Sequence, residues 1–151
     1  MEMLDAIRMV RRFHHHIGAS VADKPQLLPC HTVAARWLAL QIEKLSHTAA
    51  QGAGDDVLLS RIALALEELA EWIQAHADQD LVAAADAWAD RAYVLFGDAV
   101  ATGLPIEWLF AEVHSANMTK QYGVRTGTGK AFRGPGYRAP DVQHVLGHSP
   151  V

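Results

Sequence analysis

RIALALEELAEWIQAHADQDLVAAADAWAD, residues 61–90, is the stretch of sequence that decides the fold. Its first part carries three glutamates, with Glu67 and Glu71 four residues apart and Glu68 and Glu71 three apart. A helix at this position would place all three carboxylates on one side. Like charges at these spacings destabilise a helix by roughly a few tenths of a kcal/mol per pair, so this face needs a counter-charge.

The second part of the stretch carries Asp86 and Asp90, again four residues apart. Aspartate is a poor residue for a helix interior, and most neighbours here are alanine or aromatic, so we expect this helix to be largely buried. The small alanines would let it approach a second helix closely. Because divalent cations such as Mg²⁺ take oxygen ligands, the pattern indicates a metal site between the two acidic helices. The alternative is that both sets of acids are solvated helix faces.

Apolar residues at helical spacing continue on both sides of this stretch. The predicted helices cover 3–17, 31–49, 56–76, 81–102 and 105–121, with a turn at 51–56 and a short last helix at 140–146. In the helix 56–76, the apolar stripe that includes Leu58 and Ile62 is expected to face the core. No stretch shows sustained alternation with β-branched residues, so the sequence predicts an all-α fold without a sheet.

The chain changes character at Gly123, where GVRTGTGKAFRGPGYRAP is rich in glycine and basic residues. This composition predicts a flexible cationic tail, and residues 122–151 are interpreted as a mobile clamp over a polyphosphate. A disordered linker is the alternative. TGTGK is not a P-loop, because the spacing GxxxxGK[ST] fails and no strand precedes it.

Composition favours a single domain over residues 1–151, since half of the residues are hydrophobic and the length suffices for a core. The net charge of −4 and the lack of a dense basic block argue against a nucleic-acid surface. With one cysteine, no disulfide forms within the chain. The N-terminal residues lack a continuous apolar run, so we expect no signal peptide and no membrane span. We expect a cytoplasmic location, which is the host cytoplasm if the protein is viral.

Further positions are candidates for binding a phosphorylated ligand. Asn117 and Lys120 are three residues apart, which would place an amide and an ammonium group on one helix face, suited to phosphate oxygens. The alternative is an ordinary helix end, where a lysine complements the helix dipole. His14, together with Phe13, is a candidate wall of a base pocket, and a surface histidine is the alternative.

At the acidic residues the sequence resembles the MazG-like branch of the all-α nucleoside triphosphate pyrophosphohydrolases, whose pattern is ExxE, a spacer, and ExxD. Glu68 and Glu71 match the first half, Glu67 gives the frequent EExxE form, and Asp90 matches the last acid. The similarity continues through YVLFGDA, GLPIEWLFAEVHSANMTK and GPGYRAP. An FHxxxG-like opening precedes it at residues 13–18.

The chain departs from this family at the third acid, where Ala87 stands. Asp86 immediately precedes it, about 100° around the helix, and is interpreted as a displaced or assisting ligand. DAWAD also resembles the DALGD form of phage members and suggests the MazZ type, which is linked to converting dGTP to dGMP for a modified-purine genome. Residues 31–50 resemble an inserted helix relative to the shorter members.

The resemblance implies a MazG-like helical bundle whose four-helix core is completed by pairing subunits, as a homodimer or homotetramer. It implies hydrolysis of a nucleoside triphosphate to the monophosphate and pyrophosphate, with dGTP or GTP as substrate and two or more Mg²⁺ or Mn²⁺ ions per site. The implied catalytic residues are Glu67, Glu68, Glu71 and Asp90, and the implied metal ligands are these four with Asp86. The implied substrate-binding residues are Asn117, Lys120, Lys130, Arg133, Tyr93 and His14.

Two alternatives stay open beside this function. The same chemistry would suit dUTP or dCTP, because base recognition needs only a few hydrogen bonds. A catalytically inactive helical protein that binds nucleotides is the second alternative, and Ala87 is the feature that favours it.

Overall fold

The computed structural model describes residues 1–148, and the chain divides into two compact units. The three-helix unit comprises Lys24–Gly103, and the terminal unit combines Met1–Asp23 with the chain from Leu104 onward. The described residues form six helices and one two-stranded hairpin, so the predicted all-α class is confirmed. The single domain expected over residues 1–151 stays a prediction. None of the helices in residues 1–148, taken singly, combines the length and hydropathy needed to cross a membrane.

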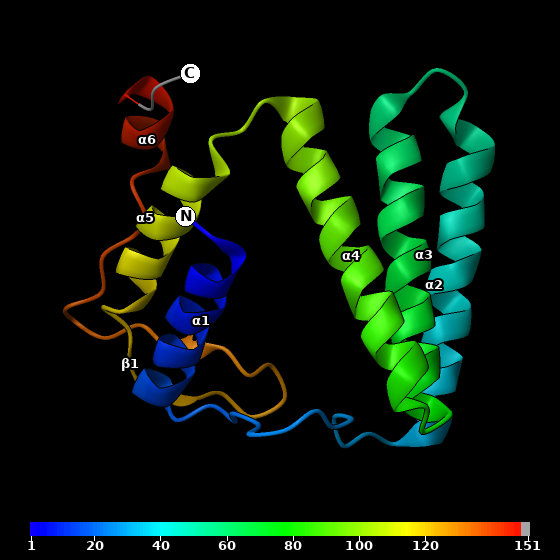
Figure 1. Ribbon diagram of the computed structural model, residues 1–151, viewed down its shortest axis with the longest axis horizontal. Coiled ribbons are helices and arrows are strands. Elements are labelled where there is room, and N and C mark those ends of the chain that lie inside the picture. Colours follow the sequence, from blue (N-terminus) through cyan, green and yellow to red (C-terminus); the bar gives the residue numbers. More distant parts are fainter. Residues whose placement is uncertain (149–151) are drawn as a thin grey trace. The chain divides into compact units, whose positions relative to one another are not determined.

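The three-helix unit consists of α2 (Thr32–Ala53), α3 (Val57–Ala77) and α4 (Leu81–Thr102). Helix α3 packs against both of the others (Figure 1). An aspartate caps the helix that follows each turn and so fixes where that helix begins. Asp56 accepts a hydrogen bond from the backbone N–H of Leu59 at 2.9 Å, and Asp80 accepts one from the N–H of Ala83 at 3.0 Å. Gly103 ends α4 in the left-handed conformation.

The terminal unit contains α1 (Met3–Ile17), α5 (Ile106–Asn117), the strands β1 (Gln121–Val124) and β2 (Ala131–Phe132), and α6 (Val142–His148). Helix α5 contacts both α1 and α6, and β1 lies against α1. Gly18 ends α1 at φ +72°, and a Cβ there would come within 2.6 Å of the Tyr122 ring, so the position requires glycine. Arg138 fastens the segment after the hairpin to α5, through the Glu112 carboxylate and, at 2.9 Å, the Ser115 hydroxyl.

The structure differs from the sequence prediction in the segment after α5. The sequence predicts a helix to residue 121 and no sheet, whereas α5 ends at Asn117 and an antiparallel hairpin follows. This hairpin pairs Gln121 with Phe132 and Val124 with Ala131. The glycine-rich segment therefore supplies the turn of a hairpin instead of an unstructured loop, and its role as a clamp stays a prediction. The predicted short last helix is present as α6.

The core of the three-helix unit is built from small side chains. Its buried apolar residues are all alanines, namely Ala39, Ala63, Ala70, Ala75, Ala77, Ala84 and Ala87. Small side chains at a helix contact let the two backbones approach closely. The buried Ser46 hydroxyl donates to the carbonyl oxygen of Ala63 at 2.8 Å, which ties α2 to α3.

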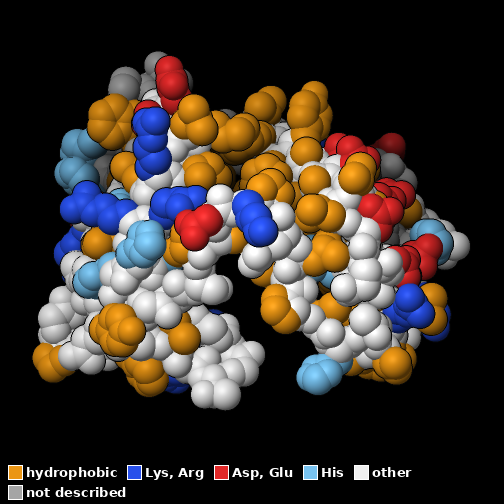
Figure 2. All heavy atoms as spheres, turned by 60° about the horizontal axis from the view of Figure 1, so that its bottom comes forward, with side chains coloured by type: hydrophobic (Ala, Val, Ile, Leu, Met, Phe, Trp, Pro, Cys, Tyr) orange, Lys and Arg blue, Asp and Glu red, His pale blue; other side chains and the backbone are white. Residues whose placement is uncertain are grey.

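Many large apolar side chains are exposed, and Figure 2 shows hydrophobic side chains over much of the visible surface. Leu58 is 69% exposed and Ile62 is 37% exposed, so the prediction that the stripe faces the core is wrong for these two residues in the single chain. The predicted burial of most of α4 is also wrong, because only Ala84 and Ala87 are buried there. The physical reason is that α4 has one neighbour within its unit and buries only the face that meets it.

Candidate functional site

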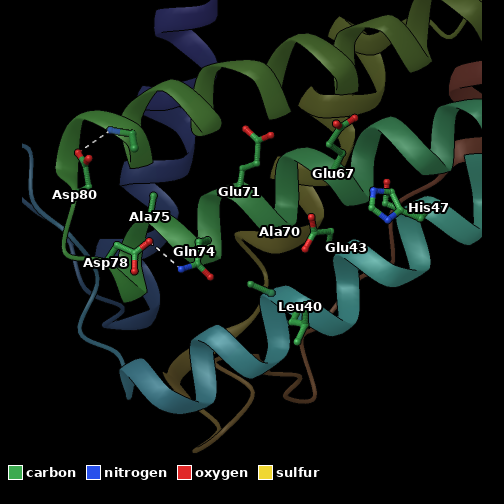
Figure 3. Close-up of a pocket in the computed structure, with 13 residues that line it drawn as sticks. Leu40, Glu43, His47, Glu67, Ala70, Glu71, Gln74, Ala75, Asp78 and Asp80 are labelled. Carbon is green, nitrogen blue, oxygen red and sulfur yellow. Dashed lines mark hydrogen bonds between the residues drawn. The ribbon is translucent and has the colours of Figure 1, made fainter.

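The three glutamates of α3 differ in their surroundings. Glu67 and Glu71 are exposed and project side by side from α3 (Figure 3). Glu68 is half-buried, and its Oε2 atom is buried without a hydrogen-bond partner among residues 1–148. Burying a charged oxygen without a donor is costly. This atom therefore marks a place where a proton or a cation would be stabilised.

The two aspartates of α4 act on the same glutamate. Burial raises the pKa of Glu68 above its ordinary value, and the negative charges of Glu71, Asp90, Glu67 and Asp86 raise that pKa further. Asp86 and Asp90 are themselves exposed. The structure thus brings these carboxylates into one electrostatic neighbourhood with Glu68 at its centre. This group of five side chains is termed the acidic cluster.

Ala87, which stands at the position of the family's third acid, is buried. Together with Ala84 it forms the buried face of α4, and small side chains on that face allow α4 to approach its neighbour closely. Asp86, one residue earlier, lies on the exposed part of the helix. An acid displaced in this way contributes its charge to Glu68 without occupying the place of the missing side chain.

The donor set of the acidic cluster fits Mg²⁺ or Mn²⁺, since both ions prefer carboxylate oxygens. Among residues 1–148, no three His, Cys, Asp or Glu side chains stand close enough together to hold a metal ion as they are. Glu71 and Asp90 are exposed, and exposed side chains change rotamer readily. Binding of a cation by this set therefore requires the side chains to move from their positions in the structure.

A groove of about 370 Å³ lies between α2 and α3 and extends to the start of α4 (Figure 3). It is hollow because small residues line it, namely Ala39, Ala70, Ala75 and Ala83. Its polar lining comprises Glu43, Ser46, His47, Glu67, Glu71, Gln74, Asp78 and Asp80. Glu67 and Glu71 thus belong both to the acidic cluster and to this groove.

Glu43 and His47 are residues that sequence reasoning did not select. The sequence predicts a structural helix or a weak duplication of residues 61–70 there, because Glu43 lacks the acidic neighbours that would form a clump. Their spacing of four residues in EKLSH was the available signal, since it places both side chains on one helix face. Which face this would be depends on how α2 packs on α3, and spacing alone does not give that.

Arg61 joins the two helices that carry the acidic cluster. Its Nε donates to the Asp98 carboxylate, and its Nη2 donates to the Val94 carbonyl oxygen at 2.7 Å. Gly97 leaves room for this guanidinium, because a Cβ there would lie 2.5 Å from Nη2. The register between α3 and α4, and with it the spacing of the carboxylates, depends on this contact.

The predicted substrate-binding residues are distributed over both units. Tyr93, on α4, is 81% exposed. Lys120 lies beyond the end of α5, so the prediction that it shares a helix face with Asn117 is wrong. The Lys120 ammonium lies 5.7 Å from the centre of the Phe13 ring. The backbone carbonyl oxygen of Lys120 lies 2.7 Å from Nε2 of His16. The backbone N–H of Lys120 still donates to the carbonyl of Asn117, at 3.0 Å.

The remaining three predicted substrate-binding residues lie in the terminal unit. Nδ1 of His14 is 2.9 Å from the carbonyl oxygen of Ser20. Lys130 lies in the hairpin turn and is exposed. The Arg133 guanidinium lies 4.8 Å from the centre of the Tyr137 ring. Their contact with phosphates or a base stays a prediction.

The family model of phosphoribosyl-ATP pyrophosphohydrolase matches residues 41–117, which is half of the chain. The matched region contains every carboxylate of the acidic cluster and the groove residues of α2 from Glu43 onward. The chain therefore belongs to the MazG-like nucleotide pyrophosphohydrolase superfamily. Within them, it belongs to the phosphoribosyl-ATP pyrophosphohydrolase family. The comparison with curated proteins gives no match. Residues 41–50 of the predicted insertion fall inside the matched region, and the insertion itself stays a prediction.

Proposed function

We propose that this chain is a metal-dependent nucleoside triphosphate pyrophosphohydrolase, with dGTP or GTP as its preferred substrate. The reaction is nucleoside triphosphate plus water to nucleoside monophosphate plus pyrophosphate. The observation that carries the proposal is the half-buried Glu68, whose buried oxygen has no partner among residues 1–148 and stands among four further carboxylates. Membership of a pyrophosphohydrolase family supports the reaction class.

In this proposal Glu68, Glu71 and Asp90 hold Mg²⁺ or Mn²⁺, two or more ions per site, and Asp86 assists them. Bound divalent cations neutralise charge on the triphosphate and make water a better nucleophile. Glu67 either completes the ligand set or orients the attacking water and takes its proton on a carboxylate oxygen. The water oxygen forms a bond to one of the two phosphorus atoms that flank the oxygen bridging the α- and β-phosphates. The bond from that phosphorus to the bridging oxygen breaks, which releases the monophosphate and pyrophosphate.

The substrate-binding residues in this proposal are those that the sequence predicts. The phosphates are assigned to Asn117, Lys120, Lys130 and Arg133, and the nucleoside to Tyr93 and His14. The active protein is a homodimer or homotetramer, because pairing of subunits completes the four-helix core. The exposed apolar residues of α4 are the observation that supports pairing.

The first test replaces Glu71 with alanine. We expect Glu71→Ala to lower pyrophosphate release from dGTP with Mg²⁺ or Mn²⁺ by about 100- to 1,000-fold, as the loss of a group that stabilises the transition state does. Helical circular dichroism should be unchanged, because Glu71 is exposed. Asp23→Ala, at another exposed acid, is the matched control and should keep full activity. Full activity of Glu71→Ala would end the metal-site account.

The buried Ala87 favours one further function, a catalytically inactive protein that binds nucleotides. Product analysis after incubation with dGTP and either cation separates the two functions. Monophosphate with pyrophosphate identifies the enzyme, whereas unchanged nucleotide with measurable binding identifies the binding protein. Competition among all canonical ribonucleoside and deoxyribonucleoside triphosphates, dUTP and dCTP included, identifies the base.

A further inference from the structure

The groove between α2 and α3 adjoins the acidic cluster, since Glu67 and Glu71 line it. Its volume of about 370 Å³ lies in the range of pockets that bind small molecules, which is roughly 300–1,000 Å³. Five apolar residues, four of them alanines, line it together with eight polar residues. A ligand whose phosphates reach the acidic cluster would therefore have space for its base here.

Glu43 and His47 stand one turn apart on α2 and project into the space between α2 and α3 (Figure 3). Other polar groups of the groove are already engaged. Ser46 donates to the carbonyl of Ala63, and the Gln74 amide donates to the Asp78 carboxylate. No hydrogen bond within residues 1–148 engages the side chain of Glu43 or His47, so both are available to a ligand.

The chemistry of this pair distinguishes among the bases. A carboxylate only accepts hydrogen bonds, and it has two oxygens that can accept in parallel. Guanine carries two adjacent donors on its Watson–Crick edge, the N1–H and the 2-amino group. Adenine and cytosine place an acceptor beside their amino group, and uracil and thymine place carbonyls on both sides of N3–H. An imidazole N–H can donate to the O6 or N7 acceptor of guanine.

We infer that this groove, in place of the pocket predicted at Tyr93 and His14, receives the base of the substrate. Glu43 and His47 are the residues that select guanine. Glu43 accepts from N1–H and the 2-amino group, and His47 donates to O6 or N7. The inference rests on the proposed function, because it places the phosphates of the same nucleotide at the acidic cluster. It goes further by assigning the choice of base to two residues of α2.

The test compares dGTP with dITP, which differs only by lacking the 2-amino group. A hydrogen bond to a charged group contributes about 1.5–3 kcal/mol, so the wild type should prefer dGTP over dITP by about 10- to 100-fold in kcat/KM. Glu43→Gln should remove this preference, because the amide presents a donor to one of the two base donors. His47→Ala should lower kcat/KM for dGTP and dITP by the same factor, since both bases carry O6 and N7. Asp55→Asn, at an exposed acid outside the groove, is the control and should keep the wild-type ratio.

Two kinetic results would overturn the inference while leaving the proposed function intact. One is a Glu43→Gln variant that keeps the wild-type ratio of dGTP to dITP. The other is a Glu43→Gln variant that loses activity on dGTP, dITP and dATP to the same extent, because that pattern identifies a metal ligand or a structural residue.

A wild type that hydrolyses no nucleotide would contradict the proposed function and leave base selection to be judged by binding. Calorimetry with dGMP and dIMP then decides. Tighter binding of dGMP that is lost in Glu43→Gln supports the inference. Equal binding of the two monophosphates, or no binding of either, overturns it.

Discussion

Glu68 is the residue at which burial and charge repulsion act together. Its pKa in the folded protein lies above the ordinary value of 4.5, mainly because of burial and also because of the neighbouring carboxylates. A raised pKa means that the folded state prefers the protonated form. The contribution of Glu68 to stability is therefore fully present below pH 4.5 and is lost as the pH rises through the raised value. When Glu68 is ionised in the metal-free protein, its surroundings disfavour that charge.

Glu68→Gln should for this reason stabilise the metal-free protein at pH 7. We expect a rise in Tm of only about 1–3 °C, because solvent screens much of the repulsion at this partly exposed group. The difference should vanish below about pH 4.5, where Glu68 is protonated in both folded and unfolded wild type. Thermal melts followed by circular dichroism in EDTA, from pH 4 to pH 8, provide the measurement.

The same variant distinguishes repulsion from cation binding. Mn²⁺ should raise the Tm of the wild type and should raise that of Glu68→Gln less, because the variant lacks a charged ligand. Asp23→Asn removes an exposed charge outside the acidic cluster and should melt as the wild type does with and without Mn²⁺. A lower Tm for Glu68→Gln in EDTA at pH 7 would contradict a buried carboxylate oxygen without a partner.

Between elements, the contact of α3 with α4 depends on a glycine. Gly97 admits the Arg61 guanidinium, which is held by Asp98 and by the Val94 carbonyl. A methyl group there would push the guanidinium from both acceptors, and overpacking of this kind costs about 1–3 kcal/mol. The better helix propensity of alanine offsets about 1 kcal/mol of that cost. Gly97→Ala should therefore lower the free energy of unfolding by about 1 kcal/mol.

Gly52→Ala is the matched control, since Gly52 is also helical and its nearest neighbour to an added Cβ is 3.8 Å away. It should raise the free energy of unfolding by about 0.5–1 kcal/mol, because alanine restricts the unfolded chain without a clash. Urea denaturation of both variants measures the two free energies. Equal changes of the same sign would show that Arg61 yields to the methyl group at no cost.

The sequence could predict the helices, the starts of α3 and α4 and the end of α4, because these signals are local. Asp56 and Asp80 cap the helices that they precede, and Gly103 ends α4. The hairpin after α5 could not be predicted in this way, because its strands are only four and two residues long and their pairing is not local. Which side of a helix is buried also depends on a partner, so Leu58 was wrongly assigned to the core while small alanines fill it.

In the candidate site, too, the residues that could be predicted are those with a local signal in the sequence. The acidic cluster follows from spacing within two neighbouring helices, so Glu68 and Asp90 could be selected from the sequence. Glu43 and His47 face the groove only because α2 packs on α3 in one register. Ala87 shows the limit of family patterns, since the sequence reveals a missing acid but not that its methyl group would be buried at a helix contact.

At the scale of the whole molecule, many large apolar side chains are exposed in the single chain. Among residues 1–148, no large side chain is fully buried. A hollow of about 310 Å³ on α3 and α4 has an apolar lining that includes Leu69, Trp88 and Leu95. Contiguous exposed apolar surface is typical of interaction sites. A second copy of the chain is the occupant in our proposal, because pairing completes a four-helix core.

Leu95→Glu should disrupt that pairing. Leu95 is 65% exposed, so a charge there costs the isolated chain little, whereas burying it unpaired at an interface is strongly unfavourable. Light scattering after size exclusion should give a dimer or tetramer for the wild type and a monomer for Leu95→Glu, with helical circular dichroism retained. Val33→Glu introduces the same charge on α2, outside the hollow, at a residue that is 83% exposed, and should keep the wild-type mass. A Leu95→Glu variant with the wild-type mass would show that the interface lies elsewhere. A monomeric wild type would show that pairing of subunits does not complete the core.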